Sequence, residues 1–486
     1  MPVILADDGD HVNIMTLAEG LLPHLLPIRA LDFRRLVRLL SSSKYLPGSL
    51  HVRNRLLHPF LVGEDAHGPL PAGKLDISTA WDRVFKGEDP VAGWAIGSVP
   101  TDLLAVSSEE ASKPEARRTQ GPWGVFLLSP GLLYKQEGIK SDGRSPPRTP
   151  RLDLWLSKPS TQDESSSGLL RAIIERVVPH LLLRSRRERE AEGDEVQQAG
   201  TQGSKIKWMC CGFDESEAEG VRRLAQVAQS DDDNPARGLA ITFDNPCLRF
   251  IGSSEVLSGA PAIHHEKDGD EEEWRLDQIR EEDIRDVIST NKIPYPPFYV
   301  RDHAHISSLV RRRRPSSGGE KVHDEAAGWT YFHSNLSVAS LYVRPDYRSS
   351  KITVKQSNLP PQDGQDEPVS GDGSAIPQKM GIGTLVSLDL AQKLVQAQRK
   401  LLAALNLDDL LLPPTGQEGS SDDMQRFGFR IGPCDVLAES ELGNVGAHAF
   451  MVKGPKFRQA GLNSWMLVEL RGSLPSEEDL DIPQSS

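Results

Sequence analysis

The feature that most constrains the fold of this chain is a pair of glycines placed directly before a long predicted helix. The segment Gln378-Lys-Met-Gly381-Ile-Gly383 runs into a helical pattern that extends from Thr384 to Leu405. Glycines lack a Cβ, so backbone N–H groups can approach and point at phosphate oxygens, and the positive end of the helix adds to the attraction. The segment is therefore a candidate cradle for a pyrophosphate group.

An apolar run upstream predicts the strand that leads to this turn. Leu336 to Val343 has the composition of a β-strand, and the turn residues Arg344 to Arg348 close it. Strand, turn, glycine loop and helix follow in the order that a phosphate-bearing cofactor requires. Glycine pairs also occur in ordinary turns, so a plain loop before a helix is the alternative.

Both halves of the chain alternate helical and strand-like patterns, which predicts a mixed α/β (α+β) fold. In the first half we expect helices at 30–40, 169–178 and 221–228, and strands at 93–99, 123–128, 152–156, 205–211, 239–243 and 248–251. In the second half, helices around 276–288 and 304–310 precede strands at 328–333 and 336–343. Strands near 427–431 and 465–470 bracket a helical segment at 444–452.

Polar insertions separate these elements. Hydrophobic residues make up 38% of the 486 residues, and the mean hydropathy of -0.41 is low for one compact globule. Stretches rich in Ser, Pro, Gly and charge are expected to be loops or disordered: 107–120, 138–150, 184–204, 230–234, 264–273, 311–325, 349–377, 413–423 and the tail after 473. They predict an N-terminal α/β lobe at 1–255, an acidic linker at 256–273, a second domain at 274–473 and a disordered tail at 474–486.

Charge and histidine spacing argue against several kinds of site. The net charge of -13 disfavours general binding to nucleic acid or to an anionic membrane surface, because both need a field of opposite sign. The basic cluster Arg311 to Arg314 is a local exception, and the Pro-Ser-Ser-Gly-Gly after it favours a solvated loop. His303 and His305 have too few companions for a metal site and are expected on a helix surface. No metal is predicted.

The cysteines and the apolar runs bear on the compartment. None of the cysteines has zinc-binding spacing, and all are expected to be buried thiols in a reducing compartment: Cys210, Cys211, Cys247 and Cys434. The N-terminal segment is acidic and short in apolar length, so it matches no signal peptide. No apolar run approaches the roughly 20 residues needed to span a bilayer. We expect a soluble intracellular protein, cytoplasmic or nuclear.

Motifs in the second half resemble those of the GNAT superfamily of acyl-CoA-dependent N-acyltransferases. Leu341-Tyr-Val343-x-Pro345-x-x-Arg348 is similar to the family's Leu-x-Val-x-Pro-x-x-Arg strand end, and Gln378-x-x-Gly381-x-Gly383 is similar to its Gln/Arg-x-x-Gly-x-Gly/Ala loop. Gly328-Trp-Thr-Tyr-Phe-His333, Asn444-x-x-Ala447 and Trp465 to Leu470 agree with the same order. The layout looks most like uncharacterised fungal GNAT-like proteins.

The resemblance implies a GNAT-like mixed sheet flanked by helices over residues 274–473, with a disordered insertion at 349–377. It also implies acetyl-CoA as co-substrate, with its pyrophosphate on one backbone segment and its pantetheine arm along the preceding strand. The residues so assigned are Gln378, Lys379, Met380, Gly381, Ile382, Gly383, Thr384, Leu341, Tyr342, Val343 and Asn444. A backbone N–H near Leu341 or Tyr342 would stabilise the oxyanion.

The chain departs from the family pattern in two places. Residues 349–377 separate Arg348 from Gln378, and we expect this insertion only to lengthen the connection between strand and cradle. Relatives often have a proton-donating Tyr seven residues after the helix-starting Asn, where this chain has Met451. A thioether cannot donate a proton. Either another group or water protonates the leaving thiolate, or the protein is slow or inactive.

Candidate catalytic residues follow from the resemblance and from side-chain chemistry. His333 is a candidate base, because the ordinary pKa of histidine lies near neutrality, although it could be a simple turn residue. Glu439 and Glu441 are alternative bases that would otherwise be solvated. Tyr342 is a candidate catalytic and cofactor-contacting residue, or else a core aromatic.

The function that the resemblance implies is N-acyl transfer from acetyl-CoA to a primary amine by direct attack in a ternary complex. The alternatives are a catalytically weak or inactive GNAT-fold scaffold and, with less support, another nucleotide-binding protein. The acceptor stays open between small amine, peptide and protein, and the acidic balance favours a cationic one. The first half contains no Gly-x-Gly loop and is expected to be a degenerate GNAT-like copy or a lobe that shapes the substrate site.

Overall fold

The structure is a computed structural model. It describes residues 25–28, 33–42, 44–62, 92–97, 121–129, 149–182, 206–229, 238–255, 257, 261–263, 273–291, 295, 297–314, 323–356, 378–411, 421–442, 444, 451 and 457–471. The predicted loops at 107–120, 184–204 and 474–486 lie outside the described residues, as do most residues of the other predicted loops.

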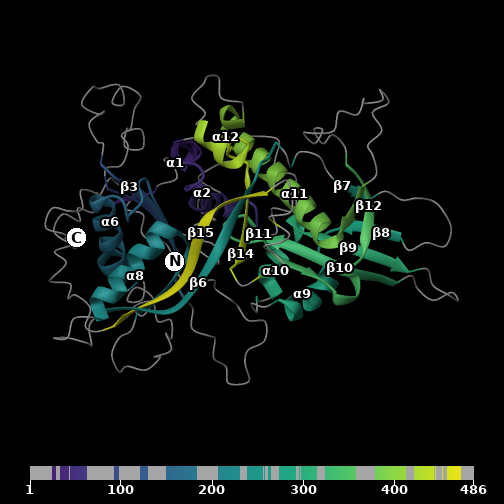
Figure 1. Ribbon diagram of the computed structural model, residues 1–486, viewed down its shortest axis with the longest axis horizontal. Helices are drawn as coiled ribbons and strands as arrows, with labels where there is room; N and C mark the ends of the chain where they lie inside the picture. The colour runs from purple at the N-terminus through teal and green to yellow at the C-terminus, as the bar shows by residue number, and fades with distance from the viewer. Residues whose placement is uncertain are drawn as a thin grey trace, which may run out of the picture.

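One twisted sheet of 12 strands runs through the length of the molecule (Figure 1), and the predicted mixed α/β fold is confirmed. From edge to edge its strands are β1 (Leu25–Pro27), β2 (Ala92–Gly97), β3 (Trp123–Ser129), β4 (Arg151–Leu156), β5 (Ile206–Asp214), β15 (Phe457–Arg471), β6 (Gly238–Gly252), β14 (Val436–Glu441), β11 (Ser337–Val343), β10 (His323–Phe332), β9 (Ser308–Arg314) and β8 (Glu273–Asp277).

The pairing pattern of this sheet is the same from either edge. Four strands joined by antiparallel pairings lead to one parallel pair, which is β4 with β5 on one side and β11 with β14 on the other. The long strands β15 and β6 lie antiparallel between the two parallel pairs. Each half is thus completed by a strand of the other, since β15 from the end of the chain pairs with β5, and β6 from the first half pairs with β14.

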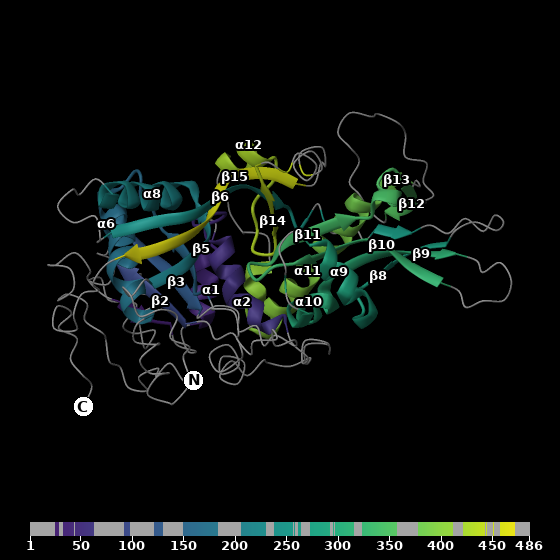
Figure 2. The ribbon, with the colours of Figure 1, turned by 90° about the horizontal axis from the view of Figure 1, so that it is seen from below.

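Helices cover both ends of this sheet. They are α1 (Phe33–Leu40), α2 (Leu50–Leu57), α6 (Glu164–Ala172), which continues as the π-turn Ile173–Val177, α8 (Glu215–Gln229), α9 (Ile284–Thr290), α10 (Pro297–His303), α11 (Ile382–Ala404) and α12 (Ser421–Phe427). Short 3-10 turns add His58–Phe60, Glu281–Asp283, Ala304–Ile306, Pro345–Tyr347 and Asp408–Leu411. In Figure 2, α1 and α2 lie beneath the middle of the sheet, between its N-terminal and C-terminal halves.

Four apolar clusters pack these helices, and one of them joins α2 and α12 to β6 and β14 around Leu50, Ile251 and Phe427. Side chains of α6 and α8 bury one face of β3, β4 and β5, around Phe126, Leu154 and Trp208. Side chains of α9 and α10 bury Trp329 and Tyr331 of β10. The largest cluster joins α1, α2 and α11 to the sheet. Because α2 contributes to this joint core, the two halves are packed together and not merely linked.

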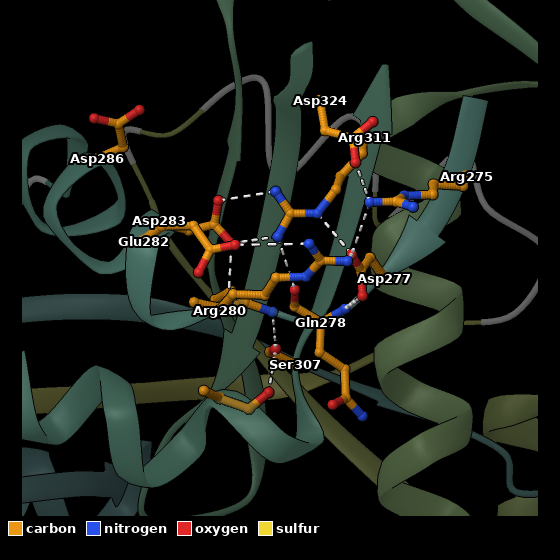
Figure 3. A network of polar contacts seen from close by, with 12 residues as sticks. Arg275, Asp277, Gln278, Arg280, Glu282, Asp283, Asp286, Ser307, Arg311 and Asp324 are labelled. Atoms are coloured by element: carbon orange, nitrogen blue, oxygen red, sulfur yellow. Dashed lines mark hydrogen bonds and ion pairs between the residues drawn. The ribbon is translucent and has the colours of Figure 1, made fainter. Parts of the chain in front are cut away.

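The basic cluster at 311–314, expected to be a solvated loop, lies instead in β9. Arg311 is 2% exposed, and its guanidinium bonds to the carboxylates of Asp277, at 2.6 Å from Nε, and of Asp283. Figure 3 shows Arg275 and Arg280 in the same network. Two carboxylates neutralise the buried cation, which makes burial on a strand tolerable.

Three predicted element boundaries of the second half are wrong. Residues 276–288 begin in the edge strand β8 and become helical only from the 3-10 turn Glu281–Asp283 into α9. Residues 304–310 form a short 3-10 turn followed by β9, not a helix. The strand expected near 427–431 lies at Val436–Glu441 instead, because Val436 and Leu437 are the residues that become fully buried between β11 and β6.

A second, three-stranded sheet contains part of the predicted insertion. Its order is β13 (Gln378–Gly381), β12 (Lys351–Gln356) and β7 (Pro261–Ile263), all antiparallel. The expectation of disorder throughout 349–377 is therefore wrong for β12. Ile352 and Val354 are 3% and 0% exposed in the core that includes α11, and this apolar burial offsets the cost of ordering the strand.

Candidate functional site

Helix α11 begins at the predicted glycine segment. Gly381 is its N-cap, with the extended conformation φ -70° and ψ 150°, and the first turn carries no acidic side chain. The first N–H groups of an α-helix have no partner within the helix. The start of α11 therefore offers backbone donors and the positive end of a long helix dipole, with no carboxylate of its own first turn to occupy them.

A third glycine seats this helix on the sheet. A Cβ added to Gly328 of β10 would lie 2.7 Å from Ile382 Cγ2 and 3.0 Å from the Tyr342 carbonyl oxygen. A Cβ at Gly383 would meet Val343 Cγ2 at an ordinary 3.5 Å, and one at Gly381 would meet nothing within 4 Å. Close approach of helix and strand thus depends on Gly328, whereas Gly381 borders open space.

The predicted cradle residues are divided between two elements. Gln378, Lys379, Met380 and Gly381 form the short strand β13 and not a free loop, and Ile382, Gly383 and Thr384 form the first turn of α11. In the ladder with β12, Lys351 lies opposite Gly381, and both Lys351 and Lys379 are exposed. The insertion therefore brings a lysine next to the helix start, where a phosphate would need a counter-charge.

Strand β11 opens beside this helix start. Its parallel pairing with β14 is limited to Ser337 with Leu437 and Val338 with Ala438, so the two strands diverge beyond Val338. Ser340 has a positive φ of 51°, and the register with β10 shifts at this point, which marks a β-bulge. The residues after the bulge are half-buried, as suits a strand that can receive an extended ligand: Leu341, Tyr342 and Val343.

The two predicted catalytic residues lie apart on the β10–β11 hairpin. Tyr342 pairs with Trp329 toward the open end, and its ring lies 4.9 Å from the Trp329 ring at 32°. Its neighbours Leu341 and Val343 pack against the core that contains α11, so Tyr342 projects to the other face, toward α9 and α10. His333 lies in the hairpin turn, where its N–H donates to the Ser337 carbonyl at 3.0 Å.

His333 has hydroxyl partners on both ring nitrogens. Tyr295 Oη lies 3.2 Å from Nε2, and Tyr299 Oη lies 3.1 Å from Nδ1. Burial lowers the pKa of His333 to about 3, and the positive charge of Arg151 acts in the same direction. The imidazole is therefore neutral at physiological pH, and as a free-standing base it is weak.

Two further histidines, unrecognised as a pair in the sequence, continue this network inward. His303 Nδ1 lies 2.6 Å from the Tyr299 carbonyl oxygen, His303 Nε2 lies 2.9 Å from His58 Nε2, and Arg55 Nη1 lies 3.4 Å from His58 Nδ1. An arginine can only donate and a carbonyl can only accept, so we assign one proton to each neutral ring between them. The expected helix-surface position of His303 is wrong, since it is 2% exposed.

Glu439, proposed from the sequence as an alternative base, lies on β14 where that strand leaves β11. Its Oε1 accepts from Asn335 Nδ2 at 3.3 Å and from Asn463 Nδ2 at 2.8 Å, and its Oε2 accepts from Trp465 Nε1 at 3.2 Å. Arg249 Nε lies 3.8 Å from Oε1. The carboxylate therefore ties the hairpin turn to β15 and β6. It has several donors to satisfy before it could act as a base.

The remaining predicted residues are less informative. Asn444 is exposed, and its backbone N–H donates to the Glu441 carbonyl at 2.9 Å. Most of the helix expected at 444–452 lies outside the described residues. Met451 is 4% exposed and belongs to the core that includes α11.

Several broader expectations can be compared with the described residues. All four cysteines are buried and unbridged, as expected. In the described part of the chain, no cluster of three or more His, Cys, Asp or Glu residues could hold a metal ion. No helix there has the length and apolar character needed to cross a membrane.

Comparison with known proteins gives distant structural likenesses. No family model and no curated protein matches the chain. Similar solved structures include a Drosophila protein (12% identity, TM-score 0.40, 92% of this chain and 98% of that one). They also include a GCN5-related N-acetyltransferase from Sphaerobacter thermophilus (9%, 0.32, 93% and 96%) and a protein described as a GNAT-family acetyltransferase from Novosphingobium aromaticivorans (10%, 0.25, 56% and 76%). At these TM-scores the likenesses lend no weight to a particular activity.

Proposed function

We propose that the protein is an acyl-CoA-dependent N-acyltransferase, which moves an acetyl group from acetyl-CoA to a primary amine in a ternary complex. One observation carries the proposal. The acid-free start of α11 meets the diverging edge of β11 at Gly383 and Val343, so phosphate donors adjoin a strand that can receive an extended chain. The motif resemblance assigns the same two elements to acyl-CoA.

The residues present fit such a ligand. The backbone from Gln378 to Thr384 would hold the pyrophosphate, with Lys351 and Lys379 as counter-charges. Leu341 to Val343 would lie along the pantetheine arm. Gly381 is the natural place for close approach, because an added Cβ there would project into unoccupied space. Acyl-CoA supplies the activated thioester.

The chemical step then depends on positioning. The amine nitrogen forms a bond to the thioester carbon, a backbone N–H after the bulge at Ser340 stabilises the oxyanion, and the carbon–sulfur bond breaks. The attacking amine loses a proton to His333 through water, and water protonates the thiolate because Met451 cannot. The low pKa of His333 makes this base weak until its surroundings change.

A non-catalytic GNAT-fold protein is the second candidate. The observation that favours it is the state of His333, whose two nitrogens are already engaged by Tyr295 and Tyr299. In this case acetyl-CoA would bind but would not turn over.

We further propose that the first half is a degenerate copy of the same unit without a cofactor site. Its strands are paired as those of the second half are, and α6 comes after β4 as α11 comes after β11, with β12 and β13 inserted in the second half. Asp163 caps α6 by accepting from the Ser166 N–H at 2.8 Å, and Glu164 adds a second carboxylate to the first turn. These carboxylates occupy a backbone donor at the start of α6 and would repel a phosphate there, whereas the first turn of α11 carries no acidic side chain.

Calorimetric titration with acetyl-CoA tests the cofactor site, and a stoichiometry of one per chain is expected. Gly381→Glu should abolish binding, because it adds bulk and negative charge to the helix start. Gly168→Glu on α6 is the matched control, since its added Cβ also meets nothing within 4 Å. Normal affinity in Gly381→Glu would place the cofactor elsewhere. Thiol release across a panel of amines then separates enzyme from non-catalytic protein.

A further inference from the structure

Arg151 is a cation of the first half that the proposed chemistry has not used. It opens β4 at the parallel pairing with β5, opposite Met209. Leu152 and Leu154 pack into the core with α6, so strand alternation directs Arg151 and Asp153 to the other face, toward α2. Arg151 therefore projects into the region where the first half meets the second.

The contacts of Arg151 in the described part of the chain include no ion pair with a carboxylate, although the nearby charge of Asp153 helps to raise the pKa of the guanidinium. Its Nε donates to Cys211 Sγ at 3.2 Å, and its guanidinium lies 5.6 Å from the centre of the Trp465 ring. Burial raises the pKa of the Cys211 thiol to about 11, so this partner is neutral. Within the described residues, no carboxylate forms an ion pair with Arg151, and Asp153 forms its ion pair with Arg55 at 3.6 Å.

A chain of contacts joins Arg151 to the proposed reaction centre. Trp465, beneath the guanidinium, donates to Glu439, and Glu439 accepts from Asn335 in the β10–β11 turn. His333 lies in the same turn, and the Arg151 charge is close enough to lower its pKa. Arg151, Trp465 and His333 are each half-buried and not fully enclosed.

We propose that Arg151 binds the carboxylate of the acceptor, so the acceptor is a free amino acid or another small amine that carries a carboxylate. This assignment depends on the proposed acyltransferase function. A guanidinium with free Nη donors matches a carboxylate in a two-point hydrogen bond. The overall charge of -13 favours a cationic acceptor, but a local cation that forms no ion pair with a carboxylate of the described residues decides which group of a zwitterion points inward.

This arrangement also explains how a weak base could become useful. A carboxylate on Arg151 would neutralise one of the two influences that keep the pKa of His333 low. Burial would remain and would still hold the pKa of His333 below its ordinary value, so the carboxylate would remove only the contribution of Arg151. The weak base in the free protein is thus compatible with turnover of this class of acceptor.

The test compares amino acids with their carboxamides, which keep the amine and remove the negative charge. Thiol release at saturating acetyl-CoA is measured with glycine against glycinamide and alanine against alaninamide, using wild type, Arg151→Gln and Arg151→Lys. Arg223→Gln is the charge-matched control, because Arg223 is an exposed residue of α8. Acetyl-CoA binding, measured by calorimetry, verifies that each variant is folded with its cofactor site intact.

We expect the amino acids to be the better substrates in the wild type. Arg151→Gln should raise their KM about ten- to a hundredfold, the scale of one charge-assisted contact, with little effect on the amides. Arg151→Lys should recover part of the loss. Equal use of acids and amides, an equal loss for both, or no thiol release from either while acetyl-CoA binds would overturn the assignment. Absence of acetyl-CoA binding in the wild type would instead refute the proposed function.

Discussion

Replacement of Gly328 by alanine should move the start of α11 away from the sheet and weaken acetyl-CoA binding without touching the ligand. The added Cβ would lie 2.7 Å from Ile382 Cγ2 and 3.0 Å from the Tyr342 carbonyl oxygen. Separations below 3.0 Å are essentially never seen for real Cβ atoms, so either the Ile382 side chain or the helix must shift. Ile382 is 2% exposed, which leaves its side chain little room to rotate.

The size of the effect follows from overpacking. Inserting one methyl group into a well-packed core costs about 1–3 kcal/mol, and Gly328→Ala belongs in this range. Ile382→Ala removes the Cγ2 atom that would collide, at its own cost of about 2–5 kcal/mol for the cavity. In the double variant the added methyl group no longer meets the Ile382 Cγ2 atom. The loss of stability in the double variant should therefore be about 1 kcal/mol smaller than the sum of the losses in the two single variants.

Denaturant unfolding of the wild type, both single variants and the double variant measures this coupling. Acetyl-CoA titration of the same proteins reports the position of the helix start. We expect Gly328→Ala to weaken binding about tenfold, equivalent to ~1.4 kcal/mol, and the double variant to recover part of the loss. Additive stability changes, or unchanged acetyl-CoA affinity in a folded Gly328→Ala protein, would refute the idea that this glycine seats the cofactor helix.

Three further predictions concern the surroundings of the site. Burial lowers the pKa of His303 to about 3 and that of His58 well below 6.5, so the unfolded chain binds more protons than the folded one at acidic pH. The free energy of unfolding should therefore fall as the pH drops from about 6.5 toward 3. His303→Gln should make the denaturation midpoint depend less on pH, and an unchanged pH dependence would contradict this role of His303. Glu439→Gln should cost about 1–3 kcal/mol in unfolding free energy, because the new amide would face hydrogen-bond donors, whereas Glu219→Gln in the exposed ion pair with Arg223 on α8 should cost little. Asp163→Ala should lower stability by about 1 kcal/mol through loss of the α6 cap and leave acetyl-CoA affinity unchanged; tight binding of a second acetyl-CoA would contradict the proposed role of the cap.

Elements with strong local periodicity were predictable from the sequence. The strands β2 to β5 and the helices α1, α6 and α8 lie close to the predicted ranges. The apolar runs of β3 and β4 are buried on both faces, and the three helices bury apolar side chains against the sheet. The two strands expected at 239–243 and 248–251 are one strand. The neighbouring strand β15 continues the ladder past Pro246, with Ser464 opposite it.

A buried element that contains many polar residues was not predicted, because its apolar spacing is weak. Helix α2 is buried along its whole length although it contains His51, Arg53, Asn54 and Arg55. Its polar groups are matched by distant partners, such as Gln398 Oε1 for Arg53 at 2.6 Å and the Leu154 carbonyl for His51 at 2.8 Å. A polar residue predicts exposure unless its partner is known, and the partner here lies far along the chain.

The sequence by itself determined the local elements and the chemistry of the α11 start, because glycine spacing and apolar periodicity act over a few residues. It also indicated His333 and Glu439 as candidate bases, although it placed the strand that carries Glu439 at 427–431. Only the tertiary structure decided that β15 and β6 cross between the halves, and that this exchange brings Trp465 and Arg151 beside the turn of His333. Strand pairing between remote segments depends on complementary faces and on closure of long loops, and no local pattern records it.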